Sequence, residues 1–101
     1  MDRPLPIDLP LDQIGTFCAR RITEFALFGS VLREDFRPDS DVDVLVSFQP
    51  TAPWSLWDLF EMQEQLGAIL GRPVDLIEKE ALRNPYRRHE ILTTRRVLYA
   101  A

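Results

Sequence analysis

The sequence predicts a single layered domain of the α/β or α+β class, on three observations. The chain has 101 residues, a length that suits one domain with one core. Its hydrophobic fraction of 46% favours a globular fold over a disordered chain. Helical and strand-like patterns alternate along it, without repeats, low-complexity tracts or a long linker. We therefore expect residues 1–101 to form one compact domain in which strands pack against helices.

The first predicted element is a helix over residues 8–21. Asp8 is a candidate cap for this helix, and Pro10 suits its first turn. Four apolar residues at helical spacing would form its buried stripe: Leu11, Ile14, Phe17 and Cys18.

Two strands are predicted next, over residues 22–28 and 41–48. The first ends at Gly29-Ser30, and a short helix or turn over residues 31–35 follows it. The second strand alternates strictly, so its side chains divide between two faces. One face carries Asp41, Asp43, Leu45 and Ser47, and the other carries Val42, Val44, Val46 and Phe48.

The strongest helical signal begins at Ser55, where Asp58 three residues later makes a capping-box pattern. Trp54 and Leu59 occupy the positions of a hydrophobic staple, and Gly71 ends the helix. The buried stripe is predicted to consist of Leu56, Leu59, Phe60, Leu66, Ile69 and Leu70.

The last third of the chain predicts a short strand over residues 73–77 and a helix over residues 86–96. Asn84-Pro85 forms a cap followed by a first-turn proline, which suits the start of that helix. Residues 97–100 are expected to form a terminal strand or a docking tail.

Three carboxylates in these strands suggest a metal site. Asp41 and Asp43 leave the same face of a strand about 7 Å apart along the chain, where they repel unless they are protonated or neutralised. Such oxygen-rich sites suit Mg²⁺, and two ions about 3.5–4 Å apart can activate an attacking oxygen and stabilise the leaving one. Asp75 could supply a third carboxylate if its strand lies beside the second strand.

The Gly29-Ser30 turn fits the phosphate side of such a site. A glycine lets the backbone approach a phosphate closely, and Ser30 can donate its hydroxyl. The N–H groups that open the following helix would point at an anion, and Arg33 and Arg37 are near enough to contact a triphosphate. Taken singly, the Gly-Ser pair could be an ordinary turn, Asp-x-Asp an acidic loop and Asp75 an exposed strand residue. Their combined spacing, order and polarity favour the site.

Gly-Ser, ten residues and then Asp-x-Asp, in "GSVLREDFRPDSDVD", resembles the signature of the DNA polymerase β-like nucleotidyltransferase superfamily. The short chain looks like its minimal nucleotidyltransferase (MNT) branch, the antitoxin partners of HEPN ribonuclease toxins. The resemblance runs from "LFGS" through "PVDLI" to "LRNPYRRHEILTTRRVLY". It implies a small mixed β-sheet flanked by helices, and Mg²⁺-dependent transfer of a nucleoside monophosphate from ATP or another NTP to a hydroxyl, with release of pyrophosphate.

Carried over residue by residue, the resemblance makes Asp41, Asp43 and Asp75 the catalytic and metal-binding residues, holding two Mg²⁺ ions. Asp75 would also act as, or position, the base for the acceptor hydroxyl. Many relatives have an aromatic residue or Arg where this chain has Val31, and Gly where it has Glu34. The nucleotide-binding residues implied are Gly29, Ser30, Arg33 and Ser40.

Composition limits the compartment and the partners. No apolar run reaches the roughly 18–20 residues of a membrane span, and the start of the chain lacks a secretory signal pattern. Cys18 is the single cysteine, so no disulfide framework is possible within the chain, and the cytoplasm is the default compartment. The net charge of −4 makes direct nucleic-acid binding an unfavoured role.

The resemblance implies a protein acceptor, because larger members of the superfamily add an acceptor-binding domain that we do not expect in this chain. The acceptor would be a tyrosine of a cognate HEPN toxin, modified with AMP in a hetero-oligomeric complex. Two alternatives stay open: a non-catalytic antitoxin that neutralises its toxin by binding, and a stand-alone transferase acting on RNA or a small molecule.

Three further features have structural and functional interpretations. Trp54 and Trp57 are expected in the core, with a partner-facing patch as the alternative. The basic segment "YRRHE" and "TTRR" is expected to be a solvated helix face, or else a surface for an acidic partner or RNA. His89 is expected at the surface.

Overall fold

The computed structural model describes residues 5, 7, 10–19, 22–33, 36–37, 40–49 and 55–100. Its strands form a four-stranded sheet in the order β3-β2-β1-β4. In chain order the elements are α1 (Leu11–Cys18), β1 (Ile22–Phe28), the 3₁₀ turn η1 (Gly29–Leu32), β2 (Val42–Phe48), α2 (Leu56–Leu70), β3 (Val74–Glu78), the 3₁₀ turn η2 (Lys79–Ala81), α3 (Pro85–Thr94) and β4 (Arg96–Ala100).

The sheet is mixed, as the predicted fold class requires. Strand β1 lies antiparallel to both β2 and β4, whereas β2 and β3 run parallel. Two parallel neighbours need a long crossover connection, and α2 provides it between β2 and β3. None of the helices in the described part of the chain is long and apolar enough to span a bilayer.

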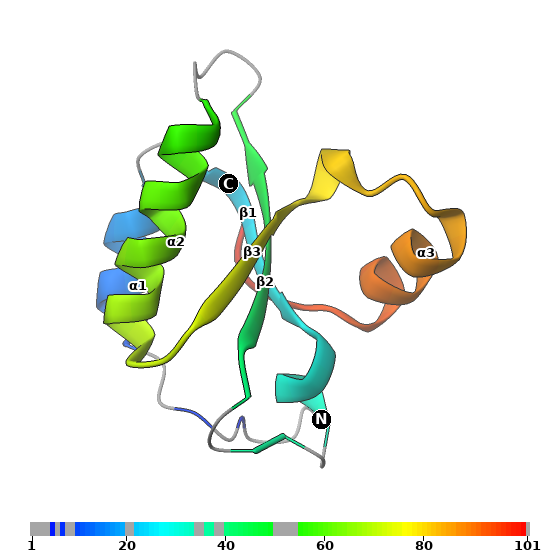
Figure 1. Ribbon diagram of the computed structural model, residues 1–101, viewed down its shortest axis with the longest axis horizontal. Helices are drawn as coiled ribbons and strands as arrows, with labels where there is room; N and C mark the ends of the chain where they lie inside the picture. The colour runs from blue at the N-terminus through cyan, green and yellow to red at the C-terminus, as the bar shows by residue number, and fades with distance from the viewer. Residues whose placement is uncertain are drawn as a thin grey trace.

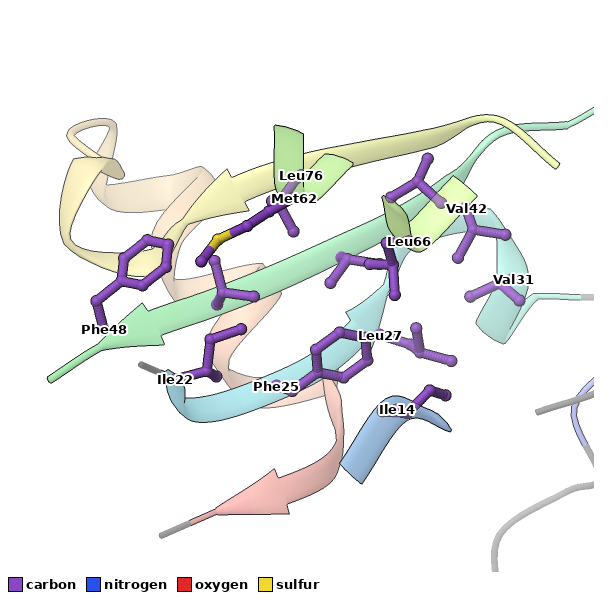
Figure 2. Packing of buried hydrophobic residues seen from close by; sticks show 13 residues of the cluster. Ile14, Ile22, Phe25, Leu27, Val31, Val42, Phe48, Met62, Leu66 and Leu76 are labelled. Atoms are coloured by element: carbon purple, nitrogen blue, oxygen red, sulfur yellow. The ribbon is translucent and has the colours of Figure 1, made fainter. Parts of the chain in front are cut away.

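Helices cover both faces of the sheet. Figure 1 shows α1 and α2 together on one face and α3 on the other. The larger apolar cluster lies on the α1–α2 face, where Phe25, Leu27 and Leu66 are fully buried (Figure 2). The smaller cluster lies on the α3 face and consists of Ala26, Phe28, Leu45, Leu82 and Ile91. The alternation predicted for residues 41–48 is therefore confirmed, because its valines face one cluster and Leu45 faces the other.

Local signals predicted several element boundaries correctly. Strand β1 has the predicted bounds, and the capping box of α2 is present: Ser55 N–H donates to Asp58 Oδ2 at 2.9 Å, and Asp58 N–H donates to Ser55 Oγ at 3.4 Å. Asn84 caps α3, with Pro85 as the first helical residue. Residues 96–100 form an edge strand rather than a docking tail. The exposed position of His89 is also confirmed.

The predicted apolar stripes were partly wrong. Leu11, Leu56 and Phe60 are 61%, 79% and 54% exposed, and Trp57 is 80% exposed rather than in the core. Phe60 lies about 100° around the helix from Leu59, which turns it away from the sheet. Leu56 belongs to the first turn of α2, which precedes the residues that pack most deeply, Met62 and Leu66.

Other boundaries differ slightly from the predictions. Pro10 is the N-cap of α1 rather than part of its first turn. Asp41 precedes β2 instead of beginning it. The predicted roles of Asp8 and Trp54 lie outside the described residues, and so do the side chains of Phe17 and Cys18.

A partly buried ion-pair network joins three segments that are distant in the sequence. Glu24 on β1 accepts hydrogen bonds from Lys79 Nζ at 3.1 Å and from Arg95 Nε at 2.7 Å. Burial alone raises the pKa of Glu24, but the hydrogen bonds from Arg95 and Lys79 outweigh it and lower the pKa below 4.5. The network therefore stabilises the fold in the ionised form of Glu24.

Candidate active site

Asp43 lies where three strands of the sheet come together. It pairs with Phe28 of β1 on one side and with Asp75 of β3 on the other. In-register neighbours on adjacent strands project from the same face, with the strands about 4.8 Å apart. The adjacency of Asp43 and Asp75, which the sequence could only suggest, is therefore present.

Gly29 brings the backbone directly against the Asp43 carboxylate. It follows β1 with φ +77°, a conformation that side-chain-bearing residues rarely adopt. A Cβ atom at this position would lie 2.3 Å from Asp43 Oδ2, closer than any real contact. The absence of a side chain at Gly29 therefore makes room for the carboxylate. The ten-residue spacer between Ser30 and Asp41 returns the chain to this contact.

Asp43 is surrounded by charges of both signs. Burial raises the pKa of the Asp43 carboxyl above 3.8, and repulsion from Asp75 and Asp41 raises it further. The positive charges of Arg87 and Arg33 act in the opposite direction. A partly buried carboxylate beside two others is a position where a cation would relieve repulsion.

The carboxylates do not form a complete metal cage by themselves. Among the described residues, no group of three or more His, Cys, Asp or Glu side chains is arranged to hold a metal ion. The donor chemistry nevertheless fits Mg²⁺, which usually binds one or two carboxylates and takes its remaining ligands from substrate phosphates and water. These carboxylates therefore suit a Mg²⁺ ion that binds together with a phosphate-bearing ligand.

A cavity of about 550 Å³ adjoins Asp43 and lies between η1 and α3. Its volume is within the usual range for small-molecule sites, roughly 300–1,000 Å³. Three of the predicted site residues lie in its wall: Gly29, Arg33 and Asp43. Its remaining lining comes from Phe28, Leu32, Arg87, Glu90, Ile91 and Thr94.

The other predicted site residues do not line the cavity. Ser30 belongs to η1, a four-residue 3₁₀ turn that provides the short helix or turn expected after β1 but begins two residues earlier than predicted. Ser40 closes a local turn, accepting from Arg37 N–H at 3.1 Å and donating its own N–H to Arg37 O at 3.0 Å. Asp41 and Asp75 are exposed at the edge of the site.

The residues that sequence reasoning missed come from α3. Arg87, Glu90 and Thr94 are exposed, as expected for the basic surface segment, and they also form one wall of the cavity. The signal that was available is their spacing of three and four residues, which places them on one side of a helix. What the sequence lacked was the strand order, because the pairing of β4 with β1 is what brings α3 across the face beside Gly29.

Comparison with known proteins gives this site a context. Residues 11–98 match the family model described as "Nucleotidyltransferase domain". The chain belongs to this nucleotidyltransferase family. The fold class and the superfamily expected from the Gly-Ser and Asp-x-Asp spacing are thereby confirmed.

Relatives of this nucleotidyltransferase domain occur among archaeal proteins. It is 41% identical over 63 residues to the protein adenylyltransferase MntA of Thermococcus cleftensis, a match that covers 62% of each protein. A protein of Methanocaldococcus jannaschii is 39% identical over 66 residues, which are 65% of this chain and 65% of the relative. The matched segment thus spans less than two thirds of either relative.

Solved structures share the fold. One, assigned provisionally as a minimal nucleotidyltransferase, has a TM-score of 0.70 and 31% identity over 85% of this chain and 86% of its own. A toxin–antitoxin structure with AMP-PNP has a TM-score of 0.73 at 19% identity, covering 92% of this chain and 75% of that one. A third contains a tri-AMPylated Shewanella oneidensis HEPN toxin in complex with an MNT antitoxin, with a TM-score of 0.65 at 18% identity, covering 90% and 70%.

Proposed function

We propose that this nucleotidyltransferase domain transfers AMP from ATP to a hydroxyl of a partner protein, and that the acceptor is a tyrosine of a HEPN toxin. The observation that carries the proposal is the position of Asp43. This carboxylate lies against Gly29, beside Asp75 in register, and in the wall of a cavity with arginines around it. Such a site suits an anionic, metal-bound nucleotide.

The protein acceptor is supported by the named relatives rather than by any residue of this chain. The Thermococcus cleftensis relative is named a protein adenylyltransferase. A HEPN toxin carrying AMP groups is the partner in one complex of the same fold. By analogy, this chain would act as the antitoxin and would form a hetero-oligomer with its toxin.

The proposed reaction conserves atoms and charge in one displacement. The acceptor oxygen forms a bond to the α-phosphorus of ATP while the bond from that phosphorus to the bridging oxygen of the β-phosphate breaks. Pyrophosphate leaves, and the proton of the acceptor hydroxyl passes to a carboxylate. Asp75 is the candidate for that carboxylate, because it is exposed to an incoming partner and lies next to Asp43.

The remaining residues would position the nucleotide. Asp41, Asp43 and Asp75 are the residues that would hold Mg²⁺, and the bound metal would neutralise the phosphates and polarise the α-phosphoryl group. Gly29 leaves room for the phosphate chain beside Asp43. Arg33 would add a positive charge from the cavity wall, whereas Ser30 and Ser40 would act only if their segments approach the nucleotide.

Labelling with nucleotide tests the proposal directly. The purified chain is incubated with its candidate toxin, Mg²⁺ and ATP labelled at the α-phosphate. We expect label on the toxin with the native chain, and none with Asp41→Ala or Asp43→Ala. Glu61→Ala removes an exposed carboxylate from α2, on the opposite face of the sheet, and should label normally.

Other outcomes would favour the competing functions. Protection of cells from the toxin by Asp43→Ala, at the level of the native chain, would indicate neutralisation by binding alone. Transfer of label to RNA in the absence of toxin would indicate a stand-alone transferase. Normal toxin labelling by both aspartate variants would show that the assigned metal-binding residues are wrong.

A further inference from the structure

One wall of the cavity beside Asp43 carries an arginine, Arg87, from helix α3. Arg87 lies in the first turn of α3 and lines the cavity together with Gly29 and Asp43. Its positive charge acts on the Asp43 carboxylate, and within the described part of the chain its guanidinium makes no side-chain hydrogen bond or salt bridge. Its neighbour Arg88 behaves differently, because it donates from Nη1 to the Lys79 carbonyl at 3.1 Å and so holds α3 to η2. Of these two adjacent arginines, one is structural and the other faces the cavity.

The position of Arg87 in the first turn of α3 is favourable only beside negative charge, and the Asp43 carboxylate is one such charge. The N-terminal end of a helix carries partial positive charge, so a cation in the first turn is repelled by it. Helix α3 has no acidic residue in its first turn to compensate. The backbone N–H groups of Tyr86 and Arg87 already donate to Asn84 Oδ1, at 2.9 and 3.2 Å. A bound anion would therefore meet the Arg87 side chain rather than the helix backbone.

The charge of the cavity wall changes from positive to negative about one turn farther along α3. Glu90 also lines the cavity, and its carboxylate makes no ion pair with Arg87 or with any other described residue. Beside it the lining becomes apolar, with Phe28 and Ile91 almost fully buried. The cavity thus has a cationic part near Asp43 and Gly29, and an anionic and apolar part farther along α3. A phosphate chain suits the first part, and a nucleoside suits the second.

We infer that Arg87 is a nucleotide-binding residue that holds the β- and γ-phosphates of the triphosphate from the α3 side. The inference rests on the proposed function, and it assigns to α3 the task of distinguishing a triphosphate from a monophosphate. Charge-assisted contacts between arginine and phosphate are geometrically specific, because the guanidinium donates in a planar fork. Lysine at the same position would keep the charge and lose the fork.

Equilibrium binding separates this role from catalysis. The affinity of the full chain for an ATP analogue with a non-cleavable α,β-bridge, and for AMP, is measured by calorimetry in Mg²⁺. Arg87→Ala should weaken binding of the ATP analogue about 10- to 100-fold, as expected for loss of hydrogen bonds to a charged group. Binding of AMP should change by less than about threefold, and Arg87→Lys should fall between Arg87→Ala and the native chain.

Arg83→Ala is the matched control, because it removes an equal charge from an exposed residue just before α3 that lies outside the cavity wall. It should leave both affinities within about twofold. Because Arg87 is exposed, Arg87→Ala should unfold at the same temperature as the native chain, so a loss of affinity would not reflect misfolding.

Each remaining outcome overturns the inference in a recognisable way. Native affinity of Arg87→Ala for the ATP analogue would show that Arg87 does not touch the nucleotide, and normal toxin labelling would then leave the proposed function standing. Equal losses for the ATP analogue and AMP would place Arg87 away from the β- and γ-phosphates. An equal loss in Arg83→Ala would indicate only a diffuse charge effect. If the native chain binds neither ligand, the inference and the proposed function fail together.

Discussion

Substitution of Gly29 by alanine tests the geometry of the site most sharply. Two effects are combined at this position. The φ of +77° disfavours any side chain, and an added Cβ would stand 2.3 Å from Asp43 Oδ2. Gly71, the C-cap of α2, has nearly the same φ of +71°, but an added Cβ there meets no atom within 4 Å. Gly71→Ala therefore isolates the backbone strain, and Gly29→Ala adds the collision.

The backbone strain should lower stability, whereas the collision with Asp43 should lower activity. A left-handed backbone costs a side-chain-bearing residue about 1–2 kcal/mol, so both variants should lose that much free energy of unfolding. For a domain of this size, each kcal/mol lowers Tm by roughly 4–8 °C. The colliding atom in Gly29→Ala is the end of a side chain, which can rotate away at little cost. Restoring even a 3.0 Å contact moves the Asp43 carboxylate by about 0.7 Å, and misplacements near 1 Å can cost about 10²-fold in rate.

Urea or thermal unfolding of both variants, combined with toxin labelling, gives the required comparison. We expect equal losses of stability, native labelling by Gly71→Ala, and labelling by Gly29→Ala reduced about 10- to 100-fold. Native labelling by Gly29→Ala would mean that the functional position of Asp43 is not the one described here. A much larger loss of stability in Gly29→Ala would mean that the carboxylate cannot move aside.

Three more substitutions have defined outcomes. Glu24→Gln should cost about 1–3 kcal/mol at pH 7 by urea unfolding. Because the folded pKa of Glu24 is lowered, its contribution is fully present above the unfolded value of 4.5 and is lost as the pH falls through the folded one. The difference between native chain and variant should therefore shrink as the pH falls below 4.5, and a constant difference would contradict the ion-pair account. Ser55→Ala should lower the free energy of unfolding by about 1 kcal/mol through loss of the α2 cap, without affecting labelling. Asp43→Asn should raise the Tm of the metal-free domain by relieving repulsion among the carboxylates while abolishing transfer; a lowered Tm would show that this carboxylate stabilises the apo fold.

Features set by short-range rules were predictable from the sequence. Strand β1, the capping box at Ser55 and the two faces of β2 follow from alternation and from pairs three residues apart. The contact between Gly29 and Asp43 was also within reach, because a strand, a glycine and a following strand with acidic residues must meet at one end of an antiparallel pair.

Features that depend on long-range arrangement were not predictable in the same way. Leu56 and Phe60 were assigned to the core because apolar residues at helical spacing do not reveal which part of a helix the sheet covers. The exposure of Arg87 was predicted, but its position in the cavity wall was not, because nothing local shows that α3 crosses the sheet beside Gly29. That position follows from β4 pairing with β1 rather than with another strand, a choice made by the whole chain.

The register of β3 against β2 couples packing of the core to alignment of the carboxylates. Side chains alternate along β3, so a slip of one residue against β2 would carry Asp75 to the opposite face. The same slip would withdraw Val74 and Leu76 from the core, at about 1.5–3 kcal/mol for each side chain. A slipped arrangement should then occupy between about one in 10² and one in 10⁴ molecules. Burial of the hydrophobic residues on one face of β3 therefore fixes the register of the acidic residue on the other face. Molecules that pack correctly also have aligned carboxylates.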